Sequence, residues 1–205
     1  MQSLFDGLDS AAQAYPQRSF RRGEFIYSVG EESNNLWLLN AGIVGLFHIS
    51  GSGKETLLRV FGPRVTLAHR SILDGGVHHA TAIALSTAEA IAIPRTEFLA
   101  ILNARPELLL ALSRQLAQDL REAEERIARV MDRTASQRVA EALVYLRLRY
   151  PEHNWTRREI AEFSETTEET CTRVMGQLEA RGLLVKQGRR FDLPAPDKLL
   201  DEAIA

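Results

Sequence analysis

The chain has 205 residues, of which 45% are hydrophobic, and its formal net charge at pH 7 is −2. This length is sufficient for two modest domains with separate cores, and the composition excludes an intrinsically disordered chain. No apolar run reaches the length of a membrane span, and the start of the chain lacks the pattern of a signal peptide. A single cysteine excludes an internal disulfide, so we expect a cytoplasmic protein with no membrane association.

Between residues 20 and 93, short apolar stretches alternate with glycines. Residues 36–39, 43–47 and 88–93 each have the composition of a short strand. Many short strands separated by turns predict an antiparallel β-roll, which we place in residues 1–105 as the first domain.

A long helix is predicted from Pro106 to Met131, with proline at a tolerated first-turn position. Apolar residues recur along it at steps of three or four, between charged flanks, which is typical of a coiled coil. We therefore expect residues 106–131 to form a homodimer. The alternative is a helix that packs only on its own domain. The expected dimer seam consists of Leu109, Leu112, Leu116, Leu120, Ala123, Ile127 and Val130.

The last domain, residues 132–205, begins with a hinge and a helix that starts at Ser136, and then contains two short helices joined by a polar turn. Thr156 and Glu159 form a capping box at the first short helix. Thr167 is expected to cap the second. This arrangement predicts a helix-turn-helix.

The second short helix has two different faces. Glu169, Thr172 and Arg173 share its exposed face, where an acid, a hydroxyl and a guanidinium can read base edges in the major groove. An ordinary helical hairpin with a solvated charged face is the alternative. The apolar face consists of Cys171, Val174, Met175 and Leu178.

Two short strands around a Gly turn follow, with Lys186, Arg189 and Arg190 at or near the tip. A helix-turn-helix followed by such a hairpin is a winged helix, and a cationic wing suits phosphate contacts. Arg and Lys outnumber Asp and Glu by only one in residues 132–193, so affinity for DNA depends on where the cations sit. The expected backbone contacts are Thr156, Arg157, Thr167, Lys186, Arg189 and Arg190.

The α+β order of Gly-rich β-roll, long helix and winged helix resembles the CRP/FNR superfamily of bacterial transcription regulators over essentially the whole chain. The resemblance implies a sensor function for the β-roll, a dimer on a two-fold symmetric DNA site, and RNA polymerase as a partner if the protein is an activator. Its specific supports are Gly30-Glu31, the strand and turn from Leu36 to Gly42, Leu73-Asp74-Gly75, Ile93-Pro94-Arg95 and Glu169-Thr170-Cys171-Thr172-Arg173.

The recognition helix is similar to the E-x-x-S-R pattern of the FNR-like branch, with Thr172 in place of Ser. The CRP-like branch has Arg where this chain has Glu168. The resemblance therefore implies a TTGAT-like half-site. Glu165 departs from the family at a turn position that is often Gly.

At the nucleotide site of the family, this chain departs further from the family pattern. Where a cyclic-nucleotide-binding member has G-E and R-S pairs, this chain has Ala68-His69 and His78-His79, and Ala123 and Glu124 replace the polar residues that meet the adenine. A cyclic phosphate then lacks its bidentate Arg partner, so we expect no binding of cyclic AMP or other cyclic nucleotides.

His69, His78 and His79, with Ala123 and Glu124, form the predicted effector pocket. One interpretation is a haem or metal site, since haem-based gas sensors occur in the superfamily and imidazole is a common ligand. The others are another small ligand, or drift of a pocket no longer in use. Adjacent histidines on a strand face opposite sides, which argues against a joint site.

An FNR-type iron–sulfur cluster is excluded because it needs several cysteines and only Cys171 is present. The apolar face that carries Cys171 favours a structural role over a redox switch. A cupin-like metalloenzyme, or a pure protein-interaction module, would leave the base-reading face unexplained. We therefore predict a homodimeric, sequence-specific DNA-binding transcriptional regulator and not an enzyme.

Overall fold

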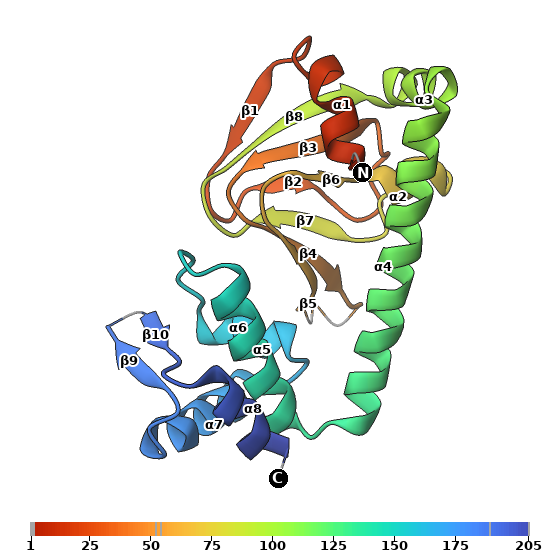
Figure 1. Ribbon diagram of the computed structural model, residues 1–205. Coiled ribbons are helices and arrows are strands. Elements are labelled where there is room, and N and C mark those ends of the chain that lie inside the picture. Colours follow the sequence, from red (N-terminus) through yellow and green to blue (C-terminus); the bar gives the residue numbers. More distant parts are fainter. Residues whose placement is uncertain (1–2, 52, 54, 189, 205) are drawn as a thin grey trace. The chain divides into compact units, whose positions relative to one another are not determined.

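The computed structural model describes residues 3–51, 53, 55–188 and 190–204 (Figure 1). The chain divides into two compact units: residues 1–54 with 58–123, and residues 55–57 with 124–205. Among the described helices, none combines the length and the hydropathy needed to cross a bilayer.

The first unit contains the predicted antiparallel β-roll. Its strands form two four-stranded sheets, in the orders β1-β8-β3-β6 and β2-β7-β4-β5. Gly42 makes the turn between β3 and β4 with a positive φ of 85°, and a Cβ at this position would collide with the backbone of Thr87 and Ala88. The strands are β1 (Gln17–Phe20), β2 (Phe25–Tyr27), β3 (Asn35–Ala41), β4 (Val44–Ile49), β5 (Glu55–Phe61), β6 (Val65–Leu67), β7 (Thr81–Ala84) and β8 (Ala88–Pro94).

Two apolar cores hold this unit together. One lies within the roll and includes Leu39 and Leu46. The other lies where the helices cover the roll, and Phe98 and Leu112 are buried in it. The helices are α1 (Leu4–Ala12), α2 (His69–Leu73), α3 (Arg95–Ala104) and α4 (Pro106–Asp132). The sequence had not indicated α1, which supplies four buried apolar side chains to the second core.

Helix α4 begins at Pro106, as predicted, and ends one residue beyond Met131. Some residues of the expected apolar seam are buried within the chain, and others are exposed. Leu112 is buried in the core of its own unit, and Leu116 packs partly against the same core. Further along, Leu120 and Ile127 are each 61% exposed in the single chain. Helix α4 is therefore packed within the chain on one side only, and its other side is exposed in the single chain.

The second unit has the predicted winged helix-turn-helix. The capping boxes are formed at α5 by Thr134 with Gln137 and at α6 by Thr156 with Glu159, and the side chain of Thr167 caps α7. The predictions for Thr156, Glu159 and Thr167 are thus confirmed. The elements are α5 (Ala135–Arg149), α6 (Arg157–Phe163), α7 (Glu168–Ala180), the wing strands β9 (Val185–Gln187) and β10 (Arg190–Asp192), and α8 (Pro196–Ile204), which the sequence had not indicated.

Apolar side chains of α5, α6 and α7 close the core of this unit, among them Leu143, Ile160 and Val174. The wing is anchored to α5 by an ion pair of 2.7 Å between Arg147 and Asp192 of β10. The three helices and the wing hairpin are therefore held together by their own contacts.

Candidate functional site

The exposed face of α7 carries the three predicted base-reading residues. Glu169, Thr172 and Arg173 are all exposed, and within the described part of the chain their side chains have no hydrogen bond or ion pair. The opposite face is buried, as its periodicity predicted, and carries Cys171 and Met175. One face of α7 is thus committed to packing, while the other offers polar groups to a partner.

The hydroxyl of Thr156 and the side chain of Arg157 lie at the start of α6, and both residues are exposed. The Thr156 side chain accepts from the backbone N–H of Glu159 at 3.2 Å, while its hydroxyl donates to the Glu159 carboxylate at 3.0 Å. At α7, the Thr167 side chain accepts from the backbone N–H of Thr170 at 3.1 Å. Both threonines therefore lie at helix N-termini, where backbone N–H groups and the helix dipole favour an anion.

The cations of the wing have different partners within the chain. Lys186 forms an ion pair with Glu179 of α7. Arg190 donates to the side-chain oxygen of Asn154 at 2.6 Å. Arg189 lies outside the described residues. The two described cations are exposed and bonded within the chain, so a phosphate contact competes with these bonds.

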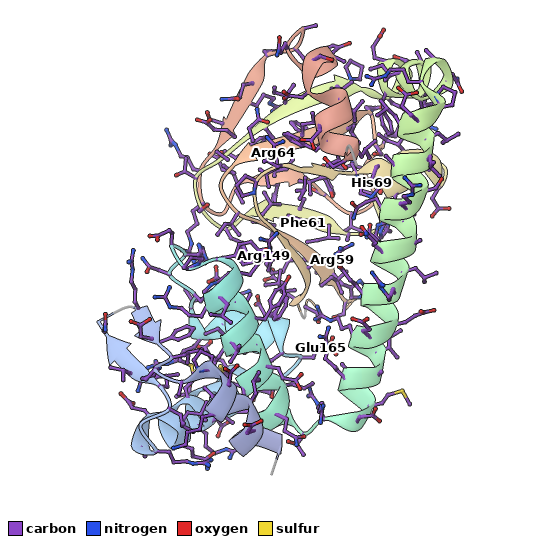
Figure 2. All side chains as sticks on the ribbon, viewed as in Figure 1. Arg59, Phe61, Arg64, His69, Arg149 and Glu165 are labelled. Carbon is purple, nitrogen blue, oxygen red and sulfur yellow. The ribbon has the colours of Figure 1, made fainter. Side chains whose placement is uncertain are left out.

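A cavity of about 20 Å³ lies between the β-roll and α4 of the first unit, with room for about one or two water molecules. Arg59 and His69, on its wall, are labelled in Figure 2. Of the predicted pocket residues, His69 and His79 line it, whereas His78, Ala123 and Glu124 do not. The lining residues are Tyr27, Leu46, Arg59, Phe61, Thr66, Leu67, Ala68, His69, Arg70, Ser71, His79, Ala80 and Asp119.

The carboxylate of Asp119, on α4, occupies the polar side of this cavity. It lies 2.7 Å from the guanidinium of Arg59, and the Gln115 amide donates to it at 3.0 Å. The His69 ring lies 3.4 Å away. Arg59 also pairs with Glu122 one turn further along α4, at 2.6 Å. The cation of β5 is therefore already neutralised by two carboxylates of the chain itself.

Burial raises the pKa of the Asp119 carboxyl, but hydrogen bonds from its three partners and the charge of Arg59 outweigh burial and hold that pKa well below its usual range. Asp119 is consequently ionised at neutral pH. In the sequence Asp119 is one of several charged residues that flank the apolar positions of α4, and no local pattern marks it, because its partners lie 50 and 60 residues away.

The two neighbouring histidines face different surroundings. His79 lines the cavity 3.4 Å from the Ser71 hydroxyl, and burial and the charge of Arg70 lower its pKa. His78 is buried elsewhere and stacks on the Tyr27 ring at 3.8 Å. Neither histidine lies in a strand, so the strand-alternation argument does not apply to this pair. Among the described residues, no group of three or more His, Cys, Asp or Glu side chains could hold a metal ion.

Cys171 lies in the core of the second unit, with its sulfur 3.8 Å from that of Met175. Burial raises the pKa of its thiol to about 11. The reactive thiolate is therefore scarce at neutral pH, which favours the structural interpretation of this residue.

The comparisons with known proteins agree with both units. Residues 17–105 match the cyclic nucleotide-binding domain family, and residues 137–202 match the Crp-like helix-turn-helix domain family. The "Cyclic AMP receptor protein" of Thermus thermophilus is 32% identical over 189 residues, which are 88% of this chain and 87% of that protein. The "Transcriptional activator protein Anr" of Pseudomonas protegens is 24% identical over 191 residues, covering 89% of this chain and 78% of that protein. The structure of FixK2 from Bradyrhizobium japonicum has the same fold, with a TM-score of 0.81 and 23% identity, over 91% of this chain and 96% of that chain.

Replacing Asp119 with Asn should destabilise the first unit by about 2–3 kcal/mol at pH 7, because it leaves Arg59 without its buried partner. The control is Glu122→Gln, which removes the exposed partner of the same arginine and should cost less than about 1 kcal/mol. Urea unfolding measures both values. Because the folded-state pKa of Asp119 is lowered, its contribution is complete above the ordinary value of 3.8 and is lost as the pH falls below it. Equal losses for the two variants would contradict the assignment.

Proposed function

Because the chain belongs to the CRP/FNR superfamily of bacterial transcription regulators, we propose that it binds a palindromic promoter site as a cytoplasmic homodimer, with α7 in the major groove. The observation that carries this proposal is the exposed, unpaired set of Glu169, Thr172 and Arg173 on α7. Among CRP/FNR recognition helices this set is most similar to that of the FNR-like branch. The site proposed is an inverted repeat resembling TTGAT-N4-ATCAA.

Each base-reading side chain has a distinct role in this proposal. The Arg173 guanidinium donates two hydrogen bonds to a guanine, Glu169 accepts from a cytosine amine, and Thr172 contacts a neighbouring base. The surrounding groups bind phosphates, which fix the register without reading sequence. They are Thr156, Arg157, Thr167, Lys186, Arg189 and Arg190.

The homodimer is supported by the exposure of the α4 seam. Leu109, Leu120 and Ile127 are each at least 50% exposed in the single chain, although they share one face of a helix. Large side chains in such a stripe are stabilised when a second copy covers them. A nearly neutral DNA-binding unit also gains from having two copies, because the two half-sites are bound together.

We further propose that the β-roll does not sense a cyclic nucleotide. The cavity has room for only one or two water molecules, and Asp119 and Glu122 already neutralise Arg59. The Thermus relative is named a cyclic AMP receptor, so this chain would differ from it in effector. The sensor then responds to another effector or to none.

A haem- or metal-based sensor is the alternative. Of the three histidines, only His69 and His79 line the cavity. A cupin-like metalloenzyme, the alternative from another class, has no observation in its favour. RNA polymerase is the expected partner if the protein is an activator.

Replacing Arg173 with Ala should cost about 1–3 kcal/mol per half-site and relax the preference at one base pair, because the bidentate contact to guanine is lost. Replacing Arg190 with Ala should instead weaken binding to all sequences alike and lower the salt dependence by about one phosphate contact. Selection from a random DNA library, followed by affinity measurements at several salt concentrations, tests both. If the wild type recovers no inverted repeat, or Arg173→Ala keeps its full preference, the proposed function is wrong.

Replacing Leu120 with Glu should dissociate the dimer while leaving both units folded, because the side chain is exposed in the single chain and only the partner helix would bury it. The matched control is Gln118→Glu, which adds the same charge on the opposite, exposed face of α4. Sedimentation at micromolar concentration measures the dimer, and circular dichroism measures the fold. A wild type that is monomeric under these conditions would remove the basis for a palindromic site.

Cyclic AMP and cyclic GMP at millimolar concentration should change neither the melting temperature nor the DNA affinity of the wild type. A ligand present at 100 times its dissociation constant stabilises the folded state by about 2.7 kcal/mol, which a thermal melt detects readily. A reproducible rise in melting temperature with either nucleotide would contradict the proposal for the cavity.

A further inference from the structure

The turn of the helix-turn-helix contains a backbone conformation that its side chain does not favour. Glu165, between α6 and α7, has a positive φ of 53°, a region that residues with a Cβ rarely adopt. Glycine at this position would avoid the conflict. An observed outlier of this kind persists when surrounding contacts impose it, and such outliers concentrate at functional sites.

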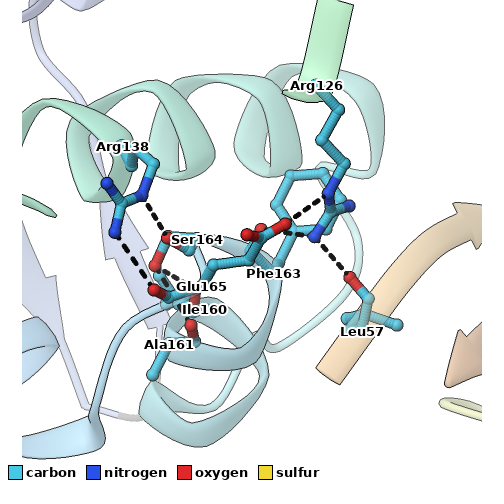
Figure 3. Close-up of polar contacts among 8 residues, drawn as sticks. All are labelled: Leu57, Arg126, Arg138, Ile160, Ala161, Phe163, Ser164 and Glu165. Carbon is cyan, nitrogen blue, oxygen red and sulfur yellow. Dashed lines mark hydrogen bonds and ion pairs between the residues drawn. The ribbon is translucent and has the colours of Figure 1, made fainter. Parts of the chain in front are cut away.

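The backbone of the turn is braced from α5. The Arg138 guanidinium donates to the Ser164 carbonyl at 2.9 Å and to the Glu165 carbonyl at 3.1 Å (Figure 3). The Ser164 hydroxyl donates back to the Ile160 carbonyl at 2.8 Å. These bonds hold the main chain of the turn without any use of the Glu165 side chain. The carboxylate is therefore not needed for the local shape of the turn.

The Glu165 carboxylate instead reaches the end of α4. The Nε–H of Arg126 donates to it at 2.8 Å, and Figure 3 shows the two side chains directed at each other. Arg126 also donates to the carbonyl oxygens of Phe163 and Leu57, and its guanidinium lies over the Phe163 ring. Leu57 belongs to the same unit as Arg126 and Phe163. Both charged side chains are less than one third exposed. The ion pair thus joins the turn, through a side chain, to the helix that carries the dimer seam.

We propose that Glu165 is a positioning residue for DNA recognition, whose ion pair with Arg126 fixes the direction of α7 relative to the end of α4. This inference rests on the proposed function, because the direction of α7 matters when two copies must meet two half-sites. Arg126 and Glu165 contact no base in this proposal. Their effect is on which spacing between half-sites the dimer accepts.

The Glu165→Gly variant separates positioning from stability. Glycine removes the carboxylate and also the backbone conflict, so the melting temperature should stay the same or rise. Affinity for a single half-site should be unchanged, because the base-reading face is intact. Discrimination between the best spacing and its neighbours should fall by roughly twofold to twenty-five-fold, since a partly exposed ion pair contributes a factor of up to about five and acts once in each protomer.

The measurement uses the full chain and DNA duplexes that carry the selected half-site once, or twice as an inverted repeat with spacers of different lengths. The control is Glu162→Gln, which breaks the ion pair of 2.7 Å with Arg158 inside α6 and should leave spacing preference unchanged. The charge swap Arg126→Glu with Glu165→Arg should restore part of the discrimination that either single change removes.

The outcomes are distinct. A merely structural role predicts that Glu165→Gly lowers the melting temperature and weakens single and paired sites equally, which would overturn the inference. Spacing discrimination equal to that of the wild type would also overturn it, while the proposed function would stand. A wild type that binds neither the single nor the paired half-site would overturn both.

Discussion

Helix α4 binds residues of its own chain with one stripe of side chains and leaves a second apolar stripe exposed in the single chain. The rest of the molecule depends on this division of its faces. Residues 108, 112, 115, 119, 122 and 126 recur at steps of four and three, so they form one stripe of the helix. The neighbouring stripe carries Leu109, Leu120 and Ile127. The first stripe binds within the chain, apolar at Leu108 and ionic at Asp119. The second is left exposed in the single chain, and we assign it to a second copy.

The change from apolar to ionic contacts along the first stripe has a physical consequence. Leucine contacts tolerate small shifts, because the hydrophobic effect has no direction. A buried carboxylate does not tolerate them, because separating it from Arg59 would take a buried negative charge away from its cationic partner. Asp119 therefore fixes the register between α4 and β5 more strictly than the apolar contacts nearer the start of the helix.

Features that depend on a few consecutive residues could be predicted from the sequence, and features that depend on distant partners could not. The capping box of Thr156 and Glu159 lies within four residues, so its spacing alone identifies it. The two faces of α7 follow from helical periodicity in the same way. The role of Asp119 depends on Arg59, which is 60 residues away in the sequence. Which of the two adjacent histidines reaches the cavity depends on the course of the chain before β7, where neither residue lies in a strand and the alternation rule does not apply.

The Asp119 contacts also limit what any effector could do. A ligand shifts a conformational equilibrium only by the difference between its affinities for the two states. In this chain Arg59, one of the two arginines that line the cavity, is already paired with Asp119, whose pKa is held low by Arg59, His69 and Gln115. An anionic effector that binds Arg59 must therefore displace a carboxylate of α4, and its net gain in free energy is only the surplus over the contacts of Asp119. Displacement of Asp119 would in turn leave Glu122 as the remaining ion-pair partner of Arg59 on α4. The contacts of Asp119 are thus the place where an anion that competes for Arg59 would act on α4 itself.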